Sequence, residues 1–269
     1  MTRIIQISDP HIVPNGQLAY GQVDTAAALT SCVETVNRLL PEIGPVDLAI
    51  VTGDITDFGT KEEYQLFREI MEPLKLPYRA IPGNHDNVVN MRDCFLDQSW
   101  MSSTGPINWT IEFNDLVLIA LDSSIAGQAH GHLSDETLSF LANTLELQKR
   151  LPVLVALHHP PITTGIEKMD IQNLRESAKL EEILSGYSGE LRLICGHVHR
   201  NIVASFGSII CQIAPGVSHA VSMDLRSGAP NCLTKEPGGV LLHETRSGIV
   251  THHIPTGQFA GPFLFYPNG

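Results

Sequence analysis

Aspartate, asparagine and histidine follow several apolar segments of this chain, each time where a β-strand is expected to end. The most compact case is Gly83-Asn84-His85-Asp86, which follows the apolar run 78–81 and Pro82. A strand that stops at a Pro-Gly turn places the next side chains at the carboxyl edge of its sheet, where ligands bind in open α/β folds. Those side chains are an amide oxygen, an imidazole and a carboxylate. On its own the tetrapeptide is a weak signal, because Gly and Asn are common in turns.

Four other apolar segments end in the same way, so the pattern is unlike a chance turn. The polar residues at all five ends form a set of seven: Asp9, His11, Asp54, Asn84, His158, His197 and His199. The carboxyl ends of strands in a parallel or mixed sheet lie along one edge, so five consecutive strands would bring these side chains together. Burying several carboxylates and imidazoles together without cations is costly. The pattern therefore predicts a metal cluster.

The types and number of the donors narrow the choice of metal and indicate how many ions are bound. Nitrogen and oxygen donors without a thiolate suit Fe, Mn, Zn or Co better than Ca²⁺ or a structural cysteine-rich zinc site. Seven donors are too many for one open catalytic ion. They suit two ions that share one carboxylate and hold a bridging hydroxide, roughly 3.5–4 Å apart.

Apolar runs and helical patterns alternate in the order expected of an α/β protein. Strands are predicted at residues 4–7, 46–51, 76–81, 152–157, 191–195 and 206–213, with hairpins at 109–121 and 239–254. Helices are predicted at 26–40, 60–71, 88–96, 134–147 and 173–184. Asp24 is a predicted N-cap, and Thr60 with Glu63 forms a capping-box pattern.

Composition narrows the partners and the compartment. The 269 residues carry a formal net charge of −12, and no cluster of Lys and Arg is present. These features argue against a nucleic-acid polymer and an anionic membrane as partners, but they allow a small anionic substrate beside metal ions. No apolar run is long enough for a membrane span. Five scattered cysteines without a C-x-x-C spacing indicate free thiols, and we expect a cytoplasmic protein.

The five blocks D-x-H, G-D, G-N-H-D, H and G-H-x-H resemble, in this order, the pattern of the calcineurin-like metallophosphoesterases. The resemblance covers roughly residues 3–215. Finer features are similar to the cyclic-nucleotide and bacterial glycerophosphodiester phosphodiesterases; these are the segments 53–57, 121–123 and 158–161. The resemblance implies an α/β fold in four αββα layers, with two mixed sheets flanked by helices.

The resemblance also implies a role for each residue of the set. Asp9, His11 and His199 would hold the first metal ion, and Asn84, His158 and His197 the second, with Asp54 bridging both. His85 would contact the phosphate and assist the leaving oxygen, and Asp86 would orient His85. His159 is left open between a supporting and a purely structural role, as is His219 between the cleft and a turn.

The composition changes after Pro215, and the tail 259–266 is aromatic. We therefore expect a catalytic domain at 1–215 and a carboxy-terminal segment at 216–269 packed on the same domain. In the glycerophosphodiesterase branch such a segment caps neighbouring active sites and helps to form the oligomer, which predicts a homo-oligomer here.

The leading hypothesis is hydrolysis of small phosphodiesters, either 3′,5′-cyclic nucleotides or glycerophosphodiesters, by two metal ions and a hydroxide that bridges them. Two carboxylates and one hydroxide against two dications leave about one positive charge, which a diester monoanion neutralises. The alternatives are a phosphomonoesterase or nuclease on the same fold, and a binding subunit without activity.

Overall fold

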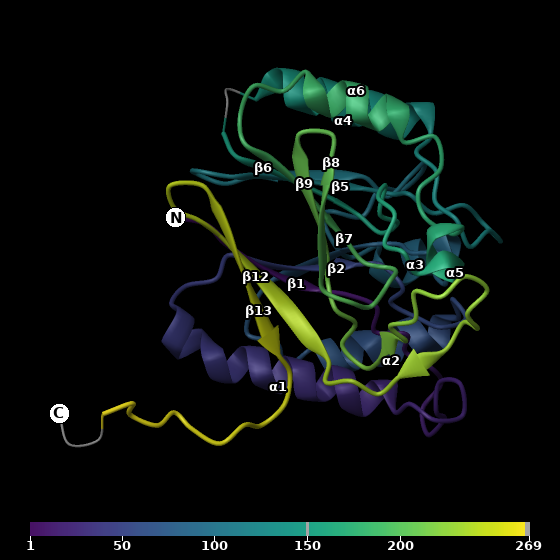
Figure 1. The fold of residues 1–269 in the computed structure, drawn as a ribbon, viewed down its shortest axis with the longest axis vertical. Helices are drawn as coiled ribbons and strands as arrows, with labels where there is room; N and C mark the ends of the chain where they lie inside the picture. The colour runs from purple at the N-terminus through teal and green to yellow at the C-terminus, as the bar shows by residue number, and fades with distance from the viewer. Residues whose placement is uncertain (149–150, 267–269) are drawn as a thin grey trace.

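The computed structural model describes residues 1–148 and 151–266, which fold around two β-sheets (Figure 1). Six helices lie in this part of the chain: α1 (Thr25–Ile43), α2 (Lys61–Met71), α3 (Val88–Phe95), α4 (Asp135–Leu147), α5 (Glu167–Asp170) and α6 (Ala178–Ser185).

The first sheet has five strands, in the order β13-β12-β1-β2-β3. They are β1 (Arg3–Ile7), β2 (Leu48–Thr52), β3 (Tyr78–Ile81), β12 (Gly239–Thr245) and β13 (Ile249–Pro255). The strands β1, β2 and β3 are parallel, so the segments that follow them leave the same edge of the sheet. β12 pairs with β1 in the opposite direction, and β13 pairs with β12.

The second sheet has six strands, in the order β4-β5-β6-β7-β9-β8. They are β4 (Trp109–Glu112), β5 (Val117–Leu121), β6 (Val153–Leu157), β7 (Leu191–Cys195), β8 (Ile202–Phe206) and β9 (Ile209–Ile213). The four central strands are parallel, and the edge strands β4 and β8 are antiparallel to their neighbours. A short pair, β10 (Ala220–Val221) and β11 (Leu233–Thr234), lies outside both sheets.

Side chains of the second sheet alternate between two apolar clusters, as expected for a strand buried on both faces. One set packs against the first sheet: Leu118, Ala120, Leu154, Ala156 and Ile194. The other set packs with α4 and α6: Val117, Ile119, Val153, Val155 and Leu193. Figure 1 shows the resulting layers, with α4 and α6 on one side and α1 and α2 on the other. The predicted four-layer αββα fold is confirmed.

The predicted helix starts are also found. The Asp24 side chain accepts a hydrogen bond from the amide of Ala27 at the start of α1. Thr60 and Glu63 form the reciprocal capping box of α2, in which each side chain accepts a hydrogen bond from the other residue's backbone amide. These local signals fix where the helices that follow β1 and β2 begin.

Two predicted helices differ in length from those observed. α1 continues to Ile43 with Pro41 inside its last turn, where the missing amide removes only one backbone hydrogen bond. The helix predicted at 173–184 begins only at Ala178. The backbone amides of Leu174 and Arg175 instead donate to the carbonyls of Pro160 and Gly131, so tertiary contacts replace the first helical turn.

The carboxy-terminal segment is part of the sheet architecture. β12 and β13 extend the first sheet, and Val240, Leu241 and Leu242 are buried. Residues 256–266 leave this hairpin and extend away from the body of the molecule (Figure 1). Residues 267–269 of the predicted segment lie outside the described part. Its role as a cap and oligomerisation element stays a prediction.

The state of the cysteines and the apolarity of the helices are relevant to the predicted cytoplasmic location. All five cysteines are free, and Cys32, Cys195 and Cys211 are buried whereas Cys232 is exposed. Within residues 1–148 and 151–266, no helix combines the length and apolarity that crossing a membrane requires. The cytoplasmic location stays a prediction.

Candidate metal centre

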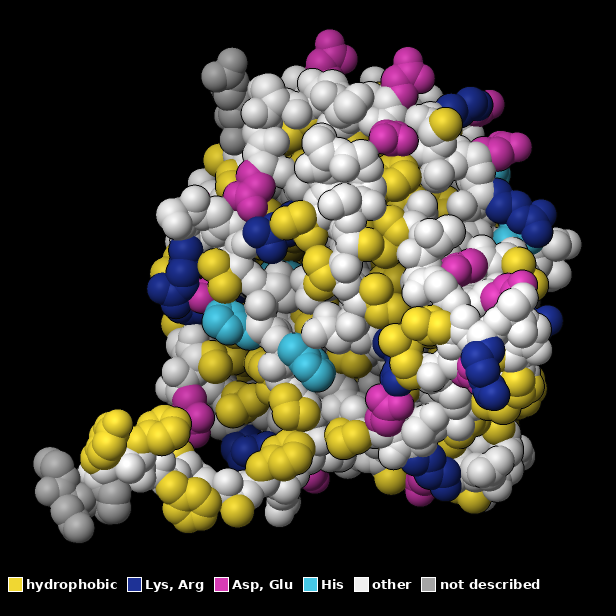
Figure 2. Space-filling model, viewed as in Figure 1, with side chains coloured by type: hydrophobic (Ala, Val, Ile, Leu, Met, Phe, Trp, Pro, Cys, Tyr) yellow, Lys and Arg dark blue, Asp and Glu magenta, His cyan; other side chains and the backbone are white. Residues whose placement is uncertain are grey.

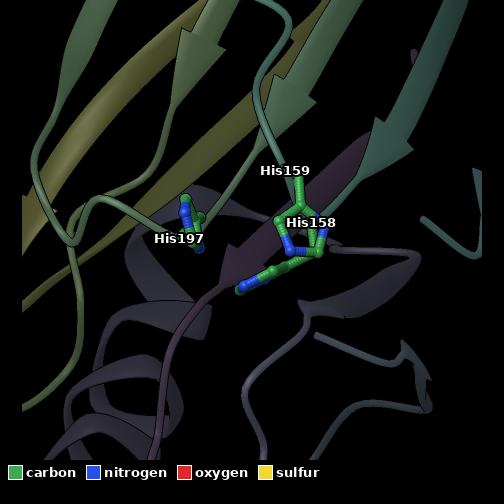
Figure 3. Close-up of side chains that lie close together, drawn as sticks. All are labelled: His158, His159 and His197. Carbon is green, nitrogen blue, oxygen red and sulfur yellow. The ribbon is translucent and has the colours of Figure 1, made fainter. Parts of the chain in front are cut away.

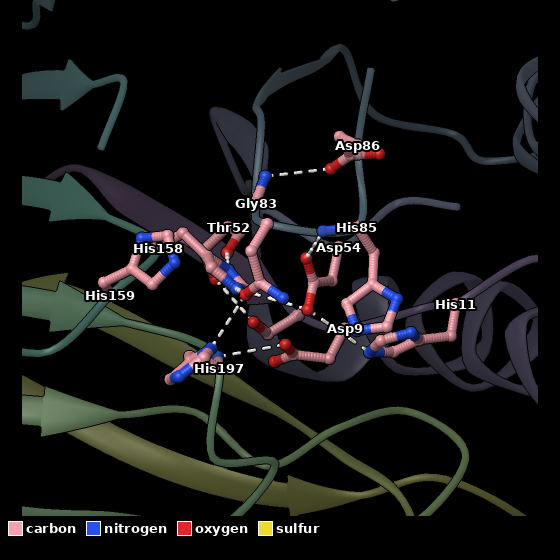
Figure 4. A network of polar contacts seen from close by, with 12 residues as sticks. Asp9, His11, Thr52, Asp54, Gly83, His85, Asp86, His158, His159 and His197 are labelled. Atoms are coloured by element: carbon pink, nitrogen blue, oxygen red, sulfur yellow. Dashed lines mark hydrogen bonds and ion pairs between the residues drawn. The ribbon is translucent and has the colours of Figure 1, made fainter. Parts of the chain in front are cut away.

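The seven predicted ligands come together where the carboxyl ends of the two sheets face each other, and Figure 4 shows most of them. Three strands of the first sheet, β1, β2 and β3, lead to Asp9, His11, Asp54 and Asn84. Two strands of the second sheet, β6 and β7, lead to His158, His197 and His199. The expectation of five consecutive strands along one edge is wrong, because β4 and β5 intervene and two sheets contribute.

One group of donors centres on His11. Its Nε2 lies 3.1 Å from Nε2 of His199 and 3.4 Å from Oδ2 of Asp54. Nε2 of His199 lies 3.4 Å from Oδ1 of Asp9. One ligand atom from each of these four residues lies within 4.8 Å of the other three, and all four residues are buried.

A second group shares Asp54 with the first. Nε2 of His158 lies 3.3 Å from Oδ2 of Asp54 and 3.2 Å from Oδ1 of Asn84. The same Asn84 oxygen lies 3.0 Å from Nδ1 of His197. Asp54 therefore contacts both groups through one carboxylate oxygen, as expected of a bridging ligand.

The tautomers that these contacts favour leave acceptors facing acceptors. Nδ1 of His11 lies 3.0 Å from Oδ1 of Asp57, and Nδ1 of His158 lies 2.8 Å from the carbonyl oxygen of Thr52. Each Nδ1 must therefore carry a proton, so in the neutral ring each Nε2 presents a lone pair to neighbouring oxygens. A cation between these lone pairs resolves the repulsion. The residues present fit two transition-metal ions.

Burial and neighbouring charges shift the pKa values of several residues of the cluster. Burial and the charge on His158 lower the pKa of His197 to about 3, so its imidazole is neutral and free to bind a metal near pH 7. Burial raises the pKa of Asp9 to about 6. Burial opposes the charging of His158, but the Asp54 carboxylate outweighs it and raises the pKa of His158 to about 9. Without metal, a proton on His158 neutralises part of the cluster, and a metal ion would displace it.

The backbone at the site is strained. Five of the seven predicted ligands have positive φ angles: Asp9 (54°), His11 (48°), Asp54 (48°), His197 (73°) and His199 (55°). Such left-handed conformations cost on the order of 1 kcal/mol each in residues other than glycine. Their concentration at one place indicates that the surrounding fold is holding these side chains inward, which is typical of a functional site.

His85 faces the cavity beside the metal groups, but Asp86 does not orient it as predicted. The Asp86 carboxylate instead accepts from the amides of Ile55, Thr56 and Gly83 and from the hydroxyls of Thr56 and Tyr64. It therefore holds the loop after β2 against the loop after β3. Nδ1 of His85 lies 2.9 Å from the carbonyl oxygen of Asp57, and its amide donates to Asp54.

Asp57 is the supporting residue that the sequence reasoning missed. Its carboxylate contacts Nδ1 of His11, lies 3.5 Å from Nδ1 of His85 and accepts a hydrogen bond from the hydroxyl of Tyr20. Its place in the segment 53–57 was the available signal, since that segment already carried part of the family resemblance.

A cavity of about 250 Å³ opens beside the cluster. Its wall includes His85, Tyr20, His219 and residues of the loops around α5 and β11. The ring of His219 lies 4.6 Å from that of His199 and 5.4 Å from that of Tyr20, so the open question about His219 resolves in favour of the cleft.

The other histidines separate into one neighbour of the site and several surface residues. His159 packs against His158 and His197, with ring centroids 4.8 and 4.9 Å away (Figure 3). Its Nδ1 lies 2.8 Å from Oγ of Ser123, and its Nε2 is buried without a hydrogen-bond partner in the described chain. His252 and His253 are exposed, and His130 is partly buried in its loop.

Comparison with known proteins agrees with this geometry. Residues 2–201 match the family model described as calcineurin-like phosphoesterase. The chain is 42% identical over 266 residues to a probable glycerophosphodiester phosphodiesterase, GpdQ, of Arcobacter nitrofigilis, covering 98% of this chain and 96% of the relative. It is 31% identical over 224 residues to the 3′,5′-cyclic adenosine monophosphate phosphodiesterase CpdA of Pseudomonas aeruginosa, covering 80% and 79%.

A solved structure shows the same fold at low sequence identity. The dimetal phosphatase of Danio rerio superposes with a TM-score of 0.63 at 13% identity, covering 95% of this chain and 99% of that one. The chain belongs to the calcineurin-like phosphoesterase family, whose members use a dinuclear metal centre. It is a metallophosphoesterase, and thus a hydrolase.

Gly83 leaves space that the metal ligands need. A Cβ at this position would lie 2.2 Å from Oδ1 of Asp54 and 2.8 Å from Cε1 of His158. We therefore expect Gly83→Ala to displace both ligands and to lower the metal content per chain, measured by elemental analysis. Gly186→Ala is the control, because its nearest neighbour, the Ile183 carbonyl oxygen, would lie 3.4 Å away. Full metal content in folded Gly83→Ala protein would contradict the assignment.

Proposed function

We propose that this protein hydrolyses small phosphodiesters with two metal ions held by the seven clustered residues. The observation that supports this most directly is the shared Asp54 oxygen, which lies within 3.4 Å of a nitrogen in each donor group. Asp9, His11 and His199 would hold one ion and Asn84, His158 and His197 the other, with Asp54 bridging. Fe, Mn, Zn and Co all suit these donors.

The cavity supports a substrate of low charge. Among the described residues that line it, none is Lys or Arg. The ions and the imidazoles must then supply all of the positive charge that a phosphate meets. With about one net positive charge, such a site neutralises a diester monoanion and leaves one negative charge of a monoester dianion uncompensated. A phosphomonoesterase is therefore the weaker alternative, and the net charge of −12 disfavours a nuclease.

The chain's own residues would bind and orient the substrate. Bound ions supply Lewis acidity and lower the pKa of water, which allows attack near neutral pH. The carbonyl oxygen of Asp57 fixes Nδ1 of His85, so Nε2 of His85 remains for the phosphate and the leaving oxygen. Tyr20 and His219 also line the cavity, where they would exclude water from the reacting phosphate.

Two substrate classes fit this site, 3′,5′-cyclic nucleotides and glycerophosphodiesters. Similarity to a glycerophosphodiesterase and to a cyclic-nucleotide phosphodiesterase supports both classes. Gln172, Asn231 and Leu233 line the outer cavity, where the alcohol would lie. The side-chain amides of Gln172 and Asn231 suit a polar alcohol such as glycerol or ribose.

Metal removal tests the reaction. Protein stripped of metal by chelation should lose hydrolysis of bis(p-nitrophenyl) phosphate and regain it with Mn²⁺ or Co²⁺, because the ligands alone supply no nucleophile. The monoester p-nitrophenyl phosphate should be cleaved much more slowly. Activity that persists without metal would reject the proposal, and faster cleavage of the monoester would favour the alternative enzyme. A folded, metal-loaded protein that cleaves neither would favour a binding subunit.

His85→Ala tests the phosphate contact. We expect kcat for the diester to fall by roughly 10²–10³-fold while metal content is unchanged, since a general acid or hydrogen-bond donor contributes about this much. His132→Ala is the matched control, because this half-exposed imidazole lies 3.6 Å from Glu176 and outside the cavity wall. A parent-like rate in His85→Ala protein would remove His85 from the mechanism.

The tail supports the expected homo-oligomer, which we propose forms through the carboxy-terminal segment. Four tail side chains are at least 77% exposed: Phe263, Leu264, Phe265 and Tyr266. Figure 2 shows this apolar arm projecting from the body. Such a surface is unfavourable in water and is typical of a contact with another chain.

Deleting residues 258–269 tests that contact. The hairpin of β12 and β13 is retained in this variant, so we expect the fold to survive and the oligomer to dissociate. Sedimentation equilibrium of the parent and the truncated chain measures the difference. A parent that is monomeric, or a truncated chain that assembles like the parent, would contradict the proposal.

A further inference from the structure

Gln6 is a fully buried amide in the middle of an apolar strand. It lies in β1 between Ile5 and Ile7, with 0% exposure, and it faces the second sheet. Burying an amide without hydrogen bonds destabilises the folded state, whereas an apolar side chain at the same position would be buried favourably. Its presence calls for a physical reason.

Every strong hydrogen-bonding group of this side chain has a partner. Oε1 of Gln6 lies 3.0 Å from Nε2 of His243 in β12. Its Nε2 donates to Oγ1 of Thr52 at 3.0 Å and to the carbonyl oxygen of Cys195 at 2.9 Å. Thr52 ends β2 in the first sheet, and Cys195 ends β7 in the second. One amide group therefore ties the two sheets together at their carboxyl ends.

Both acceptors lie directly before metal ligands. Thr52 precedes Gly53 and Asp54, and its carbonyl oxygen accepts from Nδ1 of His158. Cys195 precedes Gly196 and His197. The groups that the Gln6 amide holds thus connect to the bridging carboxylate of Asp54, from the first sheet, and to the imidazoles of His158 and His197, from the second.

We propose that Gln6 is a positioning residue that sets the separation of the two sheets at the metal centre, and with it the affinity of the second ion. The second ion is the one assigned to Asn84, His158 and His197 with Asp54, so this inference rests on the proposed function. A fully satisfied buried network specifies one geometry, whereas apolar packing tolerates small shifts. Outer residues that hold metal ligands typically change metal affinity by about 10–100-fold when replaced.

The fold should survive loss of the amide. The carbonyl oxygen of Cys195 also accepts from the amide of Ala214 at 2.8 Å, so it keeps a partner within its own sheet. Methionine has nearly the shape of glutamine and no polar hydrogen. Gln6→Met therefore removes the tie between the sheets while retaining the packed volume.

The experiment compares metal binding to the apo forms of the parent, Gln6→Met and Thr52→Val by Mn²⁺ calorimetry, with electron paramagnetic resonance at two equivalents of Mn²⁺. Thr52→Val is an additional variant that removes the hydroxyl shared by Gln6 and Ser8 but keeps the bond to Cys195. Gln6→Leu, which also lacks the amide, decides the question alone if Gln6→Met does not fold. Thr245→Val is the control. It deletes another bond between the sheets, from Oγ1 of Thr245 in β12 to Oδ2 of Asp115 in the β4–β5 turn at 2.7 Å, at the ends of the sheets opposite the ligand loops.

We expect the first ion to bind Gln6→Met as it binds the parent, and the second to bind 10–100-fold more weakly, with the six-line signal of uncoupled Mn²⁺ at two equivalents. Parent-like affinity for both ions would overturn the role of Gln6. So would an equal loss in Thr245→Val, because the effect would then reflect general stability. A parent that binds fewer than two ions would overturn the proposed function instead.

Discussion

The structure depends on one electrostatic constraint, which is that nitrogen and oxygen lone pairs face one another in a buried space. Nε2 of His11 and Nε2 of His158 both point at Asp54, while their other ring nitrogens are held by Asp57 and Thr52. Protons neutralise this arrangement only in part, since the surroundings keep His197 and His199 neutral. Two cations would remove the repulsion between the lone pairs. The burial that makes the cluster unfavourable without metal also strengthens its binding of the ions.

The fold meets this constraint by placing two sheets face to face with their carboxyl ends aligned. Neither sheet has enough ligands for two ions, because the first provides the carboxylates and the second most of the imidazoles. Short loops with left-handed residues turn the side chains inward, and Asp86 ties two of these loops together. The separation of the two sheets therefore sets the distances between the ligands, and the buried amide of Gln6 lies where it can control that separation.

Binding of the ions and selection of the substrate are assigned to different parts of the chain. The ligands follow strands of the sheets, where the backbone is rigid. The cavity wall comes from connecting segments, including Tyr20, the loop at α5 and the β10–β11 pair. Related phosphodiesterases with different substrates can therefore share one metal centre, since changes in these segments leave the strand ends in place.

The sequence by itself determined the seven polar residues that cluster, the four-layer fold and most helix starts, because each rests on local patterns: a polar residue after an apolar strand, or a capping box. Local patterns do not say which strands face each other. Only the tertiary structure decided that two sheets share the site, that Asp57 rather than Asp86 supports His85, and that Leu174 and Arg175 leave their helix to bond distant carbonyls. These outcomes depend on contacts between residues far apart in the chain. The packing of the fold, and not the neighbouring residues in sequence, determines which partner each polar group bonds.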